Sequence, residues 1–323
     1  MARDFPKPQD RYPVVYLKDT DLPLPKHVVN NKMRYAYFKT IARGGKCIIQ
    51  SCKDFHLSRV VAYKSLRPEI ADDPFEQQRF LREARVTAML QHPNTIPIYE
   101  LSRDTSGHYY FTMKLVEGST LRELLDARSK DTEDLRLARR VEILAQVGHA
   151  LDYAHQHGVV HRDVKPENVL VGPFGEVLLL DWGLAKVWSM TEEQVPPMPF
   201  EEVEDPSLTA RGKLQGTILY MSPEQAAESS DLDHRTDIYS LGAVLYEALS
   251  FESMLRGKTT YELLEAVEQG AIESPRERRP DLEIPAVLDR ICLRCVANDP
   301  ADRYQTMAEV VAELQAWRRS ITP

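Results

Sequence analysis

Residues 161–168 read His161-Arg162-Asp163-Val164-Lys165-Pro166-Glu167-Asn168, and Asp181-Trp182-Gly183 follows after two short apolar runs. The polar residues are spaced from Asp163: a lysine stands two positions on, an amide five positions on, and a second carboxylate eighteen positions on. The apolar runs, 169–171 and 177–180, predict a pair of short strands. The polar side chains are therefore expected in the turns that flank this pair.

These side chains suit the transfer of a phosphoryl group. That reaction needs an acceptor for the proton of the attacking hydroxyl, a cation near the moving phosphate, and oxygen ligands for Mg²⁺. Asp163 can supply the first and Lys165 the second, and the pair Asn168 and Asp181 can supply the third. A structural carboxylate in a turn does not explain the lysine and the asparagine as well.

Both motifs resemble the catalytic-loop and metal-binding signatures of the protein kinase family, and the resemblance covers roughly residues 35–317. It implies an α+β, bilobal fold, with a small N-terminal antiparallel β-sheet lobe that carries one helix and a larger, mostly helical C-terminal lobe. The implied boundaries are an N-terminal extension at 1–32, an N-lobe at 33–116 and a C-lobe at 117–323, with an activation segment at 181–224.

The pattern before residue 117 predicts a sheet with one helix. Short apolar stretches between 35 and 66, and again at 95–101 and 109–116, are typical of strands. Asp73-Pro74 predicts the start of a helix, with aspartate as its cap and proline at its first position. The earlier run Tyr12–Leu17 is either an edge strand on the folded surface or part of a mobile tail.

Helical spacing dominates after Gly118. Apolar residues that recur every three or four positions predict a long helix over 135–157, and further helices follow from about Asp237. A sheet lobe joined to a helical lobe has a natural cleft at the joint.

The resemblance also implies an ATP site. Lys64 resembles the family's ATP-anchoring lysine, and Glu83 resembles the glutamate that pairs with it to orient the α- and β-phosphates. From the residues alone, either would be a surface charge. The resemblance further implies the contacts of the adenine ring. Apolar side chains enclose the base: Ile41, Ile49, Ala62 and Leu170. Met113 lies at the back of the pocket, and the hinge residues Lys114 and Val116 contribute backbone groups. Without the resemblance, all of these residues would be assigned to the core.

The predicted phosphate-covering loop departs from the family pattern G-x-G-x-x-G. That pattern falls on Ala42-Arg43-Gly44-Gly45-Lys46-Cys47, where only the middle glycine, Gly44, is retained. Glycines let backbone amides approach phosphate closely, so we expect weakened but not abolished ATP binding. Lys46 adds positive charge to this loop, and Cys47 adds a thiol for which the sequence shows no lowered pKa.

Two further residue pairs and one single aspartate have expected roles. By resemblance, Glu224 pairs with Arg303, and Asp237 ties the catalytic loop from below. Lys165 and Thr217 indicate serine/threonine specificity.

The acidic, proline-rich insert 191–206 is either a mobile loop or part of a regulated switch. In the second interpretation, phosphate on Thr209 or Ser207 pairs with Arg162 and orders the activation segment.

Composition and charge argue against several classes of protein. With 41 basic and 49 acidic side chains the net charge is −8, which argues against a nucleic-acid partner. The sequence has no secretory signal and no apolar run long enough to be a membrane segment, so a reducing, cytoplasmic setting is expected. The motif Cys292-x-x-Cys295 is a metal or redox site in one interpretation; we favour the other, an apolar helix face.

The sequence thus predicts a serine/threonine protein kinase, similar to the bacterial branch of the eukaryotic-like family, which uses ATP and Mg²⁺ and acts on protein substrates. Autophosphorylation of the activation segment, in a homodimer, is a further expectation. One alternative is a pseudokinase that serves as a nucleotide-binding scaffold or allosteric partner; a second is a kinase for small molecules, against which the stretch 217–224 argues. Related bacterial kinases often continue into regulatory or membrane segments, which leaves open that this sequence is part of a longer protein.

Overall fold

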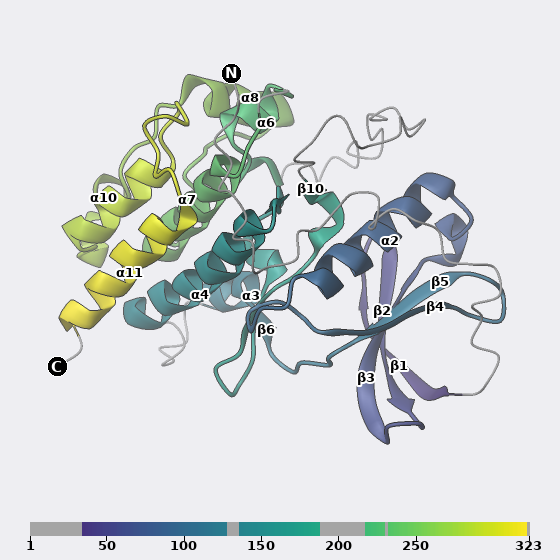
Figure 1. Ribbon diagram of the computed structural model, residues 1–323. Helices are drawn as coiled ribbons and strands as arrows, with labels where there is room; N and C mark the ends of the chain where they lie inside the picture. Colours follow the sequence, from purple (N-terminus) through teal and green to yellow (C-terminus); the bar gives the residue numbers. More distant parts are fainter. Residues whose placement is uncertain (1–33, 128–135, 188–216, 230–231, 322–323) are drawn as a thin grey trace.

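The computed structural model describes residues 34–127, 136–187, 217–229 and 232–321 (Figure 1). The predicted N-terminal extension, with the run Tyr12–Leu17, lies outside these residues. So do Ser207, Thr209 and most of the predicted activation segment. The larger sheet lies at one end of the structure and most helices lie at the other, which confirms the predicted α+β plan (Figure 1).

The N-terminal part is a five-stranded sheet with the order β1-β2-β3-β5-β4, in which every neighbouring pair is antiparallel. Side chains of successive strand residues point to opposite faces. On β3, Ala62 and Leu66 enter the hydrophobic cluster beneath helix α2, and Tyr63 enters a second cluster on the other face. Lys64 lies between Ala62 and Leu66 in this alternation and shares their face. The strands are β1 (Tyr35–Arg43), β2 (Cys47–Asp54), β3 (Arg59–Leu66), β4 (Ile98–Arg103) and β5 (Tyr109–Met113).

Helix α2 (Pro74–Met89) covers that face of the sheet (Figure 1). The Asp73 carboxylate accepts hydrogen bonds from the backbone N–H groups of Phe75 (2.9 Å) and Glu76 (3.2 Å), and Pro74 takes the first helical position. The predicted helix start is therefore confirmed. Phe80 of α2 packs against Phe111 of β5, with ring centroids 5.0 Å apart, and fixes the helix over the sheet. A short 3₁₀ turn, η1 (Pro68–Ile70), connects β3 to α2.

Strand boundaries around β4 and β5 differ from the prediction. The strand expected over 109–116 ends at Met113, and the strand expected from Thr95 begins at Ile98. Thr95 itself makes an isolated parallel β-bridge with Leu179, and its hydroxyl lies within hydrogen-bonding distance of the carbonyl oxygens of Leu90 (2.5 Å) and His92 (2.8 Å). Pro97 has no N–H to contribute to a sheet, so the continuous strand starts only after it.

The rest of the described chain is mostly helical and carries two small sheets, with the orders β6-β8-β9 and β10-β7. The long helix predicted over 135–157 is α4 (Leu137–Gln156). The other helices are α3 (Leu121–Asp126), α6 (Pro223–Ala226), α7 (Arg235–Ser250), α8 (Thr260–Gln269), α9 (Pro275–Arg278), α10 (Ala286–Cys295) and α11 (Met307–Ile321). The short strands are β6 (Ser119–Thr120), β7 (Val159–Val160), β8 (Val169–Val171), β9 (Val177–Leu179) and β10 (Lys186–Val187), and the 3₁₀ turns are η3 (Pro166–Asn168), η4 (Trp182–Leu184) and η6 (Pro280–Leu282).

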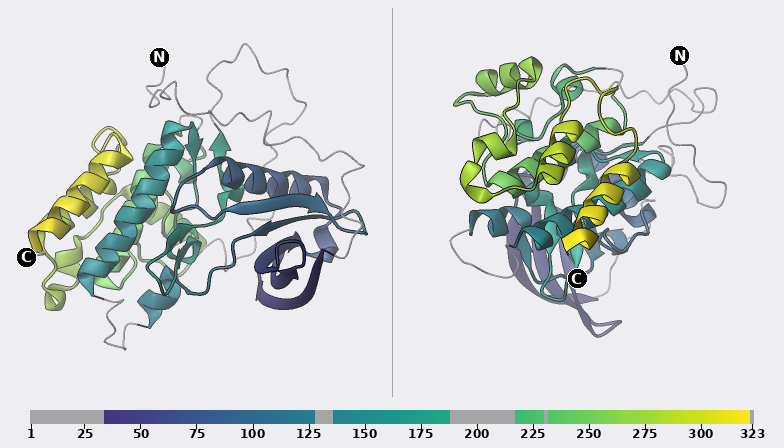
Figure 2. Two further views of the ribbon diagram at one scale, coloured as in Figure 1. Left: turned by 60° about the horizontal axis from the view of Figure 1, so that its bottom comes forward. Right: turned by 90° about the vertical axis from the view of Figure 1, so that its left-hand side faces the viewer.

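Helix α7 forms the centre of the helical part, where it packs against α4, α10 and α11. Helices α4 (teal) and α11 (yellow) lie side by side (Figure 2). The residues of α7 are buried from Thr236 to Ser250, so it is a core helix on all sides. A Cβ at Gly242 would lie 2.4 Å from the Cβ of Cys295, which shows why only glycine permits this approach of α7 and α10. Cys292 and Cys295 are fully buried thiols in the same cluster, which confirms the apolar-face interpretation.

No helix in the part of the chain that the structure describes is long and apolar enough to cross a bilayer.

The predicted pair of Glu224 and Arg303 is confirmed. The guanidinium of Arg303 donates two hydrogen bonds to the Glu224 carboxylate, at 2.7 and 2.8 Å, and three more to the backbone carbonyls of Ala297, Arg235 and Asn298. The Arg303 side chain has no exposed surface. It therefore joins the α6 segment to the ends of α7 and α10.

We predict that Arg303→Ala lowers the free energy of unfolding by about 3–5 kcal/mol, because the substitution leaves the half-buried Glu224 carboxylate and three carbonyls without their donor. Urea denaturation followed by tryptophan fluorescence measures the change. The exposed Arg290→Ala, on α10, is the matched control and should change stability by less than about 0.5 kcal/mol. An equal effect of both substitutions would contradict the prediction.

Candidate active site

The backbone of residues 161–168 is held from below by one buried carboxylate, Asp237 of α7. It accepts hydrogen bonds from the backbone N–H groups of His161 (2.8 Å) and Arg162 (2.9 Å), and its Oδ2 lies 2.8 Å from Nε2 of His155. Arg162 has a φ of 70°, a left-handed conformation that is uncommon for a residue with a side chain. Burial alone would raise the pKa of Asp237, but His155 and the backbone amide hold it below its usual value. The predicted role of Asp237 is confirmed.

Asp163 lies at the centre of a set of polar side chains. Nζ of Lys165 lies 2.8 and 2.7 Å from its two carboxylate oxygens, and Nδ2 of Asn168 donates to its backbone carbonyl (2.8 Å) and to Oδ2 (3.1 Å). Burial raises the pKa of Asp163, and the Lys165 charge only partly opposes this effect. The structure therefore brings together three of the residues that the sequence spacing singled out.

Lys165 also contacts Thr217, the other residue on which the expected serine/threonine specificity rests. Its ammonium group donates to Oγ1 of Thr217 at 3.2 Å, across 52 residues of sequence. One lysine therefore bridges the Asp163 carboxylate and the C-terminal end of the predicted activation segment. The hydroxyl, the ammonium and the carboxylate define a small polar surface at this place.

The second motif lies against the first. The backbone N–H of Leu180 donates to the carbonyl of Asn168 (2.8 Å), and Nε2 of His161 lies 3.0 Å from the Leu180 carbonyl. Asp181 follows with a φ of 62° and accepts from the N–H of Gly183 at 3.3 Å. Burial would raise the pKa of Asp181, but the positive charges of Lys64 and Lys165 are among the groups that hold it below its usual value.

Lys64 and Glu83 form the expected ion pair. Nζ of Lys64, on β3, lies 2.5 Å from Oε1 of Glu83, on α2, and both side chains are 12% exposed. Burial alone would lower the pKa of Lys64, but the carboxylates of Glu83 and Asp181 raise it above its usual value. The lysine therefore stays charged and lies within the electrostatic reach of both carboxylates.

Most of the predicted adenine contacts gather in the cluster beneath α2. Ala62 and Met113 are buried there, and their strands pair at these residues. Ile49, Val116 and Leu170 are half-buried and pack against the same cluster. Ile41 lies outside this cluster and is 51% exposed. Lys114 was expected to contribute only backbone groups, and Nζ of its side chain lies 3.7 Å from Glu176.

The turn between β1 and β2 is closed by a hydrogen bond from the N–H of Gly44 to the carbonyl of Cys47 (2.9 Å). Gly44 has ordinary room for a side chain, since a Cβ there would lie 3.5 Å from its nearest neighbour. Cys47 packs against the cluster beneath α2. Burial raises the pKa of its thiol to about 11, which disfavours the reactive thiolate.

The donor set fits a magnesium ion by its chemistry. Carboxylate and amide oxygens are hard ligands of the kind that Mg²⁺ prefers. The amide nitrogen of Asn168 is directed at Asp163, which leaves the amide oxygen as a possible ligand beside Asp181. In the described ranges no group of three or more His, Cys, Asp or Glu side chains is arranged to hold a metal. Asn168 and Asp181 are the residues that would hold an ion here.

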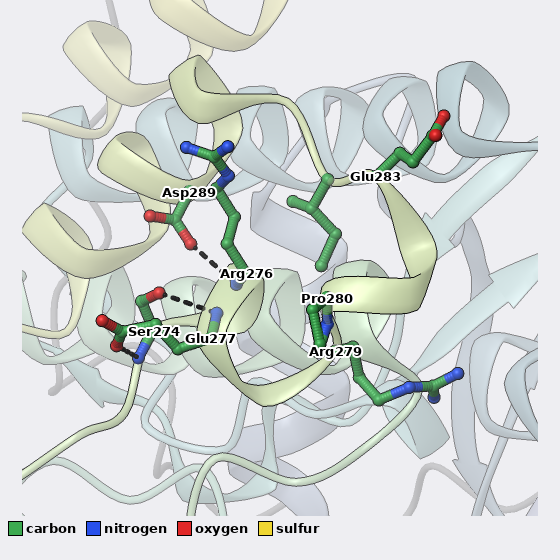
Figure 3. A pocket seen from close by; sticks show the side chains of 8 residues that line it. Ser274, Arg276, Glu277, Arg279, Pro280, Glu283 and Asp289 are labelled. Carbon is green, nitrogen blue, oxygen red and sulfur yellow. Dashed lines mark hydrogen bonds between the residues drawn. The ribbon is translucent and has the colours of Figure 1, made fainter.

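A separate hollow lies in the helical part, between α9, η6 and α10 (Figure 3). It has a volume of about 680 Å³, and oppositely charged side chains line it. The backbone N–H of Arg276 donates to Asp289 at its edge (3.1 Å). None of the predicted site residues is among its lining residues, which are Ser274, Arg276, Glu277, Arg279, Pro280, Glu283, Ile284 and Asp289.

Sequence reasoning missed Arg122 of α3. Its guanidinium donates to Glu167 of the catalytic loop (3.0 Å) and to both carboxylate oxygens of Glu247 on α7 (2.6 and 3.0 Å). It also contacts the hydroxyl of Tyr220. These partners lie 45 to 125 residues away, so no local pattern marks the arginine.

Comparison with known proteins agrees with this geometry. The family model described as the protein kinase domain matches residues 35–314. A serine/threonine-protein kinase PknD of Protochlamydia amoebophila is 34% identical over 291 residues, which are 87% of this chain and 29% of that protein. The PknD of Chlamydia muridarum is 35% identical over 298 residues, 87% of this chain and 31% of that protein. The chain thus spans about three tenths of the length of these relatives. Through the match over 35–314, the chain belongs to the protein kinase domain family.

Proposed function

We propose that this chain is a serine/threonine protein kinase, which transfers the γ-phosphoryl group of Mg-ATP to serine and threonine hydroxyls of protein substrates. The observation that carries the proposal is the bridge of Lys165 between Asp163 and Thr217, because it joins a proton acceptor, a phosphate-binding cation and the activation segment. The relatives named as serine/threonine kinases support the same reaction. The proposed N-lobe is 33–116 and the proposed C-lobe is 117–323.

In the proposed reaction, the hydroxyl oxygen of the substrate bonds to the γ-phosphorus of ATP while the bond from that phosphorus to the β–γ bridging oxygen breaks. ADP leaves, and Asp163 accepts the hydroxyl proton. Lys165 lies beside that carboxylate and stabilises the charge on the moving phosphoryl group. Lys64, which Glu83 holds in place, orients the α- and β-phosphates.

Asn168 and Asp181 are the proposed magnesium ligands. When bound, Mg²⁺ neutralises charge on the phosphates. The lowered pKa of Asp181 keeps it ionised for this role. The adenine ring is proposed to bind among Ile41, Ile49, Ala62, Met113 and Leu170, with backbone contacts from Lys114 and Val116 and with Gly44 near the phosphates.

We predict that Asp163→Asn and Lys64→Met each lower kcat/KM by about 10²–10⁴-fold, because the first removes the proton acceptor and the second a phosphate-orienting charge. Transfer of radiolabel from ATP to a protein mixture, with Mg²⁺ present, measures the change. Lys53→Met is the control, since this lysine of β2 bonds only the Ser58 carbonyl among the described contacts (2.7 Å) and should leave activity unchanged.

Phosphoamino-acid analysis of the labelled protein decides the specificity. Label on serine and threonine is expected, and label confined to tyrosine would overturn that part of the proposal. A wild-type chain that binds ATP but transfers no label would instead be a nucleotide-binding scaffold.

The acid limb of the pH profile should report on Asp163. Its pKa is raised by burial, so on acidification the carboxylate takes up a proton at a higher pH than the usual 3.8 and can no longer accept one from the substrate. We therefore predict that kcat/KM falls with decreasing pH with an apparent pKa above 3.8. Asp181, with a lowered pKa, should not contribute to this limb. Circular dichroism at each pH checks that the fold persists; constant activity down to pH 4 would contradict the prediction.

Cys47 should react slowly with alkylating reagents, since a pKa of about 11 leaves roughly one thiolate in a thousand at pH 8. Iodoacetamide labelling between pH 7 and 10, followed by peptide mass mapping, measures this reactivity. The labelling rate should still rise tenfold per pH unit at pH 9 to 10. A rate that levels off below pH 9 would show that the thiol has a normal or lowered pKa.

A further inference from the structure

The turn between β1 and β2 is linked to α2 by a second ion pair, which lies outside the predicted site. Nζ of Lys46 donates to Oε1 of Glu76 at 2.7 Å, across 30 residues of sequence. The Lys46 side chain is 33% exposed and the Glu76 side chain is 10% exposed. The pair is therefore partly shielded from water, which strengthens it relative to an ordinary surface pair.

The same turn has two more anchors. The Lys46 carbonyl accepts from the backbone N–H of Arg67 (2.8 Å), just past the end of β3. Cys47, the next residue, packs against the cluster beneath α2. The turn that lacks two of the family's three glycines is thus held by a side-chain ion pair, a backbone hydrogen bond and a half-buried thiol.

Glu76 and Glu83 are seven residues apart on α2, which is about two helical turns, so they project from one face of the helix. Each pairs with a lysine: Glu76 with Lys46 of the turn between β1 and β2, and Glu83 with Lys64 of β3. The two ion pairs therefore fix α2 to the sheet at two points along its length. A movement of α2 that lengthened one pair would strain the other.

We propose that Lys46 and Glu76 are positioning residues that couple the phosphate-covering turn to α2, so that the turn and Glu83 take up their nucleotide-binding positions together. The inference rests on the proposed function, because it deepens the account of the ATP site. In this proposal Lys46 acts on the nucleotide site indirectly, through its ion pair with Glu76 on α2. The positive charge of the lysine, considered alone, would instead predict direct contact with the nucleotide.

The experiment measures binding of a fluorescent ATP analogue with Mg²⁺ in the Asp163→Asn background, in which turnover cannot interfere. Lys46→Met, Glu76→Gln and the double variant should each raise the Kd by about 3- to 30-fold. The Kd of the double variant should not exceed the larger of the two single-variant Kd values. The reversed pair, Lys46→Glu with Glu76→Lys, should regain part of the affinity. Lys39→Met and Glu69→Gln, exposed residues of β1 and of the connection before α2, are the matched controls and should leave the Kd unchanged.

Hydrogen–deuterium exchange of the same variants separates coupling from simple contact with the nucleotide. Loss of the ion pair should speed exchange in both the turn, 44–47, and the helix segment 74–83, without nucleotide. Additive losses in the double variant, no recovery in the reversed pair, or faster exchange in the turn alone would each overturn the proposal. A parent protein that binds no nucleotide would instead refute the proposed function.

Discussion

One buried carboxylate sets the geometry on which the candidate site depends. Asp237 lies on α7, whose residues are buried along almost its whole length, and it accepts the backbone N–H groups of His161 and Arg162. Arg162 adopts a left-handed conformation that costs about 1–2 kcal/mol for an ordinary side chain, so the loop needs such a restraint. Because α7 cannot shift without disturbing the core around it, the loop that carries Asp163 takes on the rigidity of the helical part.

Helix α2 provides a corresponding restraint on the sheet side. Its Glu83 holds the Lys64 ammonium group, and that charge also acts on Asp181. Trp182, next to Asp181, is fully buried in the main hydrophobic cluster with Val86 of α2. The helix therefore contacts the sheet through both ion pairs and apolar side chains, and it contacts the helical part through apolar side chains. A shift of α2 would separate Lys64 from Glu83 and expose apolar surface at once, which favours a single arrangement of both parts.

Local patterns predicted which side chains of the candidate site lie together, whereas contacts between distant segments were harder to foresee. Asp163, Lys165 and Asn168 lie within six residues, and the spacing alone indicated their chemistry. Asp73-Pro74 marked the start of α2 because capping is a local interaction. The turn at Thr95 was missed, since a hydroxyl that bonds nearby carbonyls leaves the same apolar pattern as a strand. The partners of Arg122 and Lys46 could not be foreseen, because a lone basic residue does not specify which distant carboxylate it will pair with.

The two aspartates of the site show how one set of lysines can support two different roles. Asp163 is enclosed, and burial raises its pKa even though Lys165 contacts both of its oxygens. Asp181 is close to Lys64 and Lys165, and their combined charge lowers its pKa. A carboxylate with a raised pKa holds an accepted proton more firmly, whereas one with a lowered pKa remains an anion that a cation can use as a ligand. The proposed separation of proton acceptor from metal ligand, which the sequence spacing already indicated, therefore agrees with the position of each aspartate relative to the lysines.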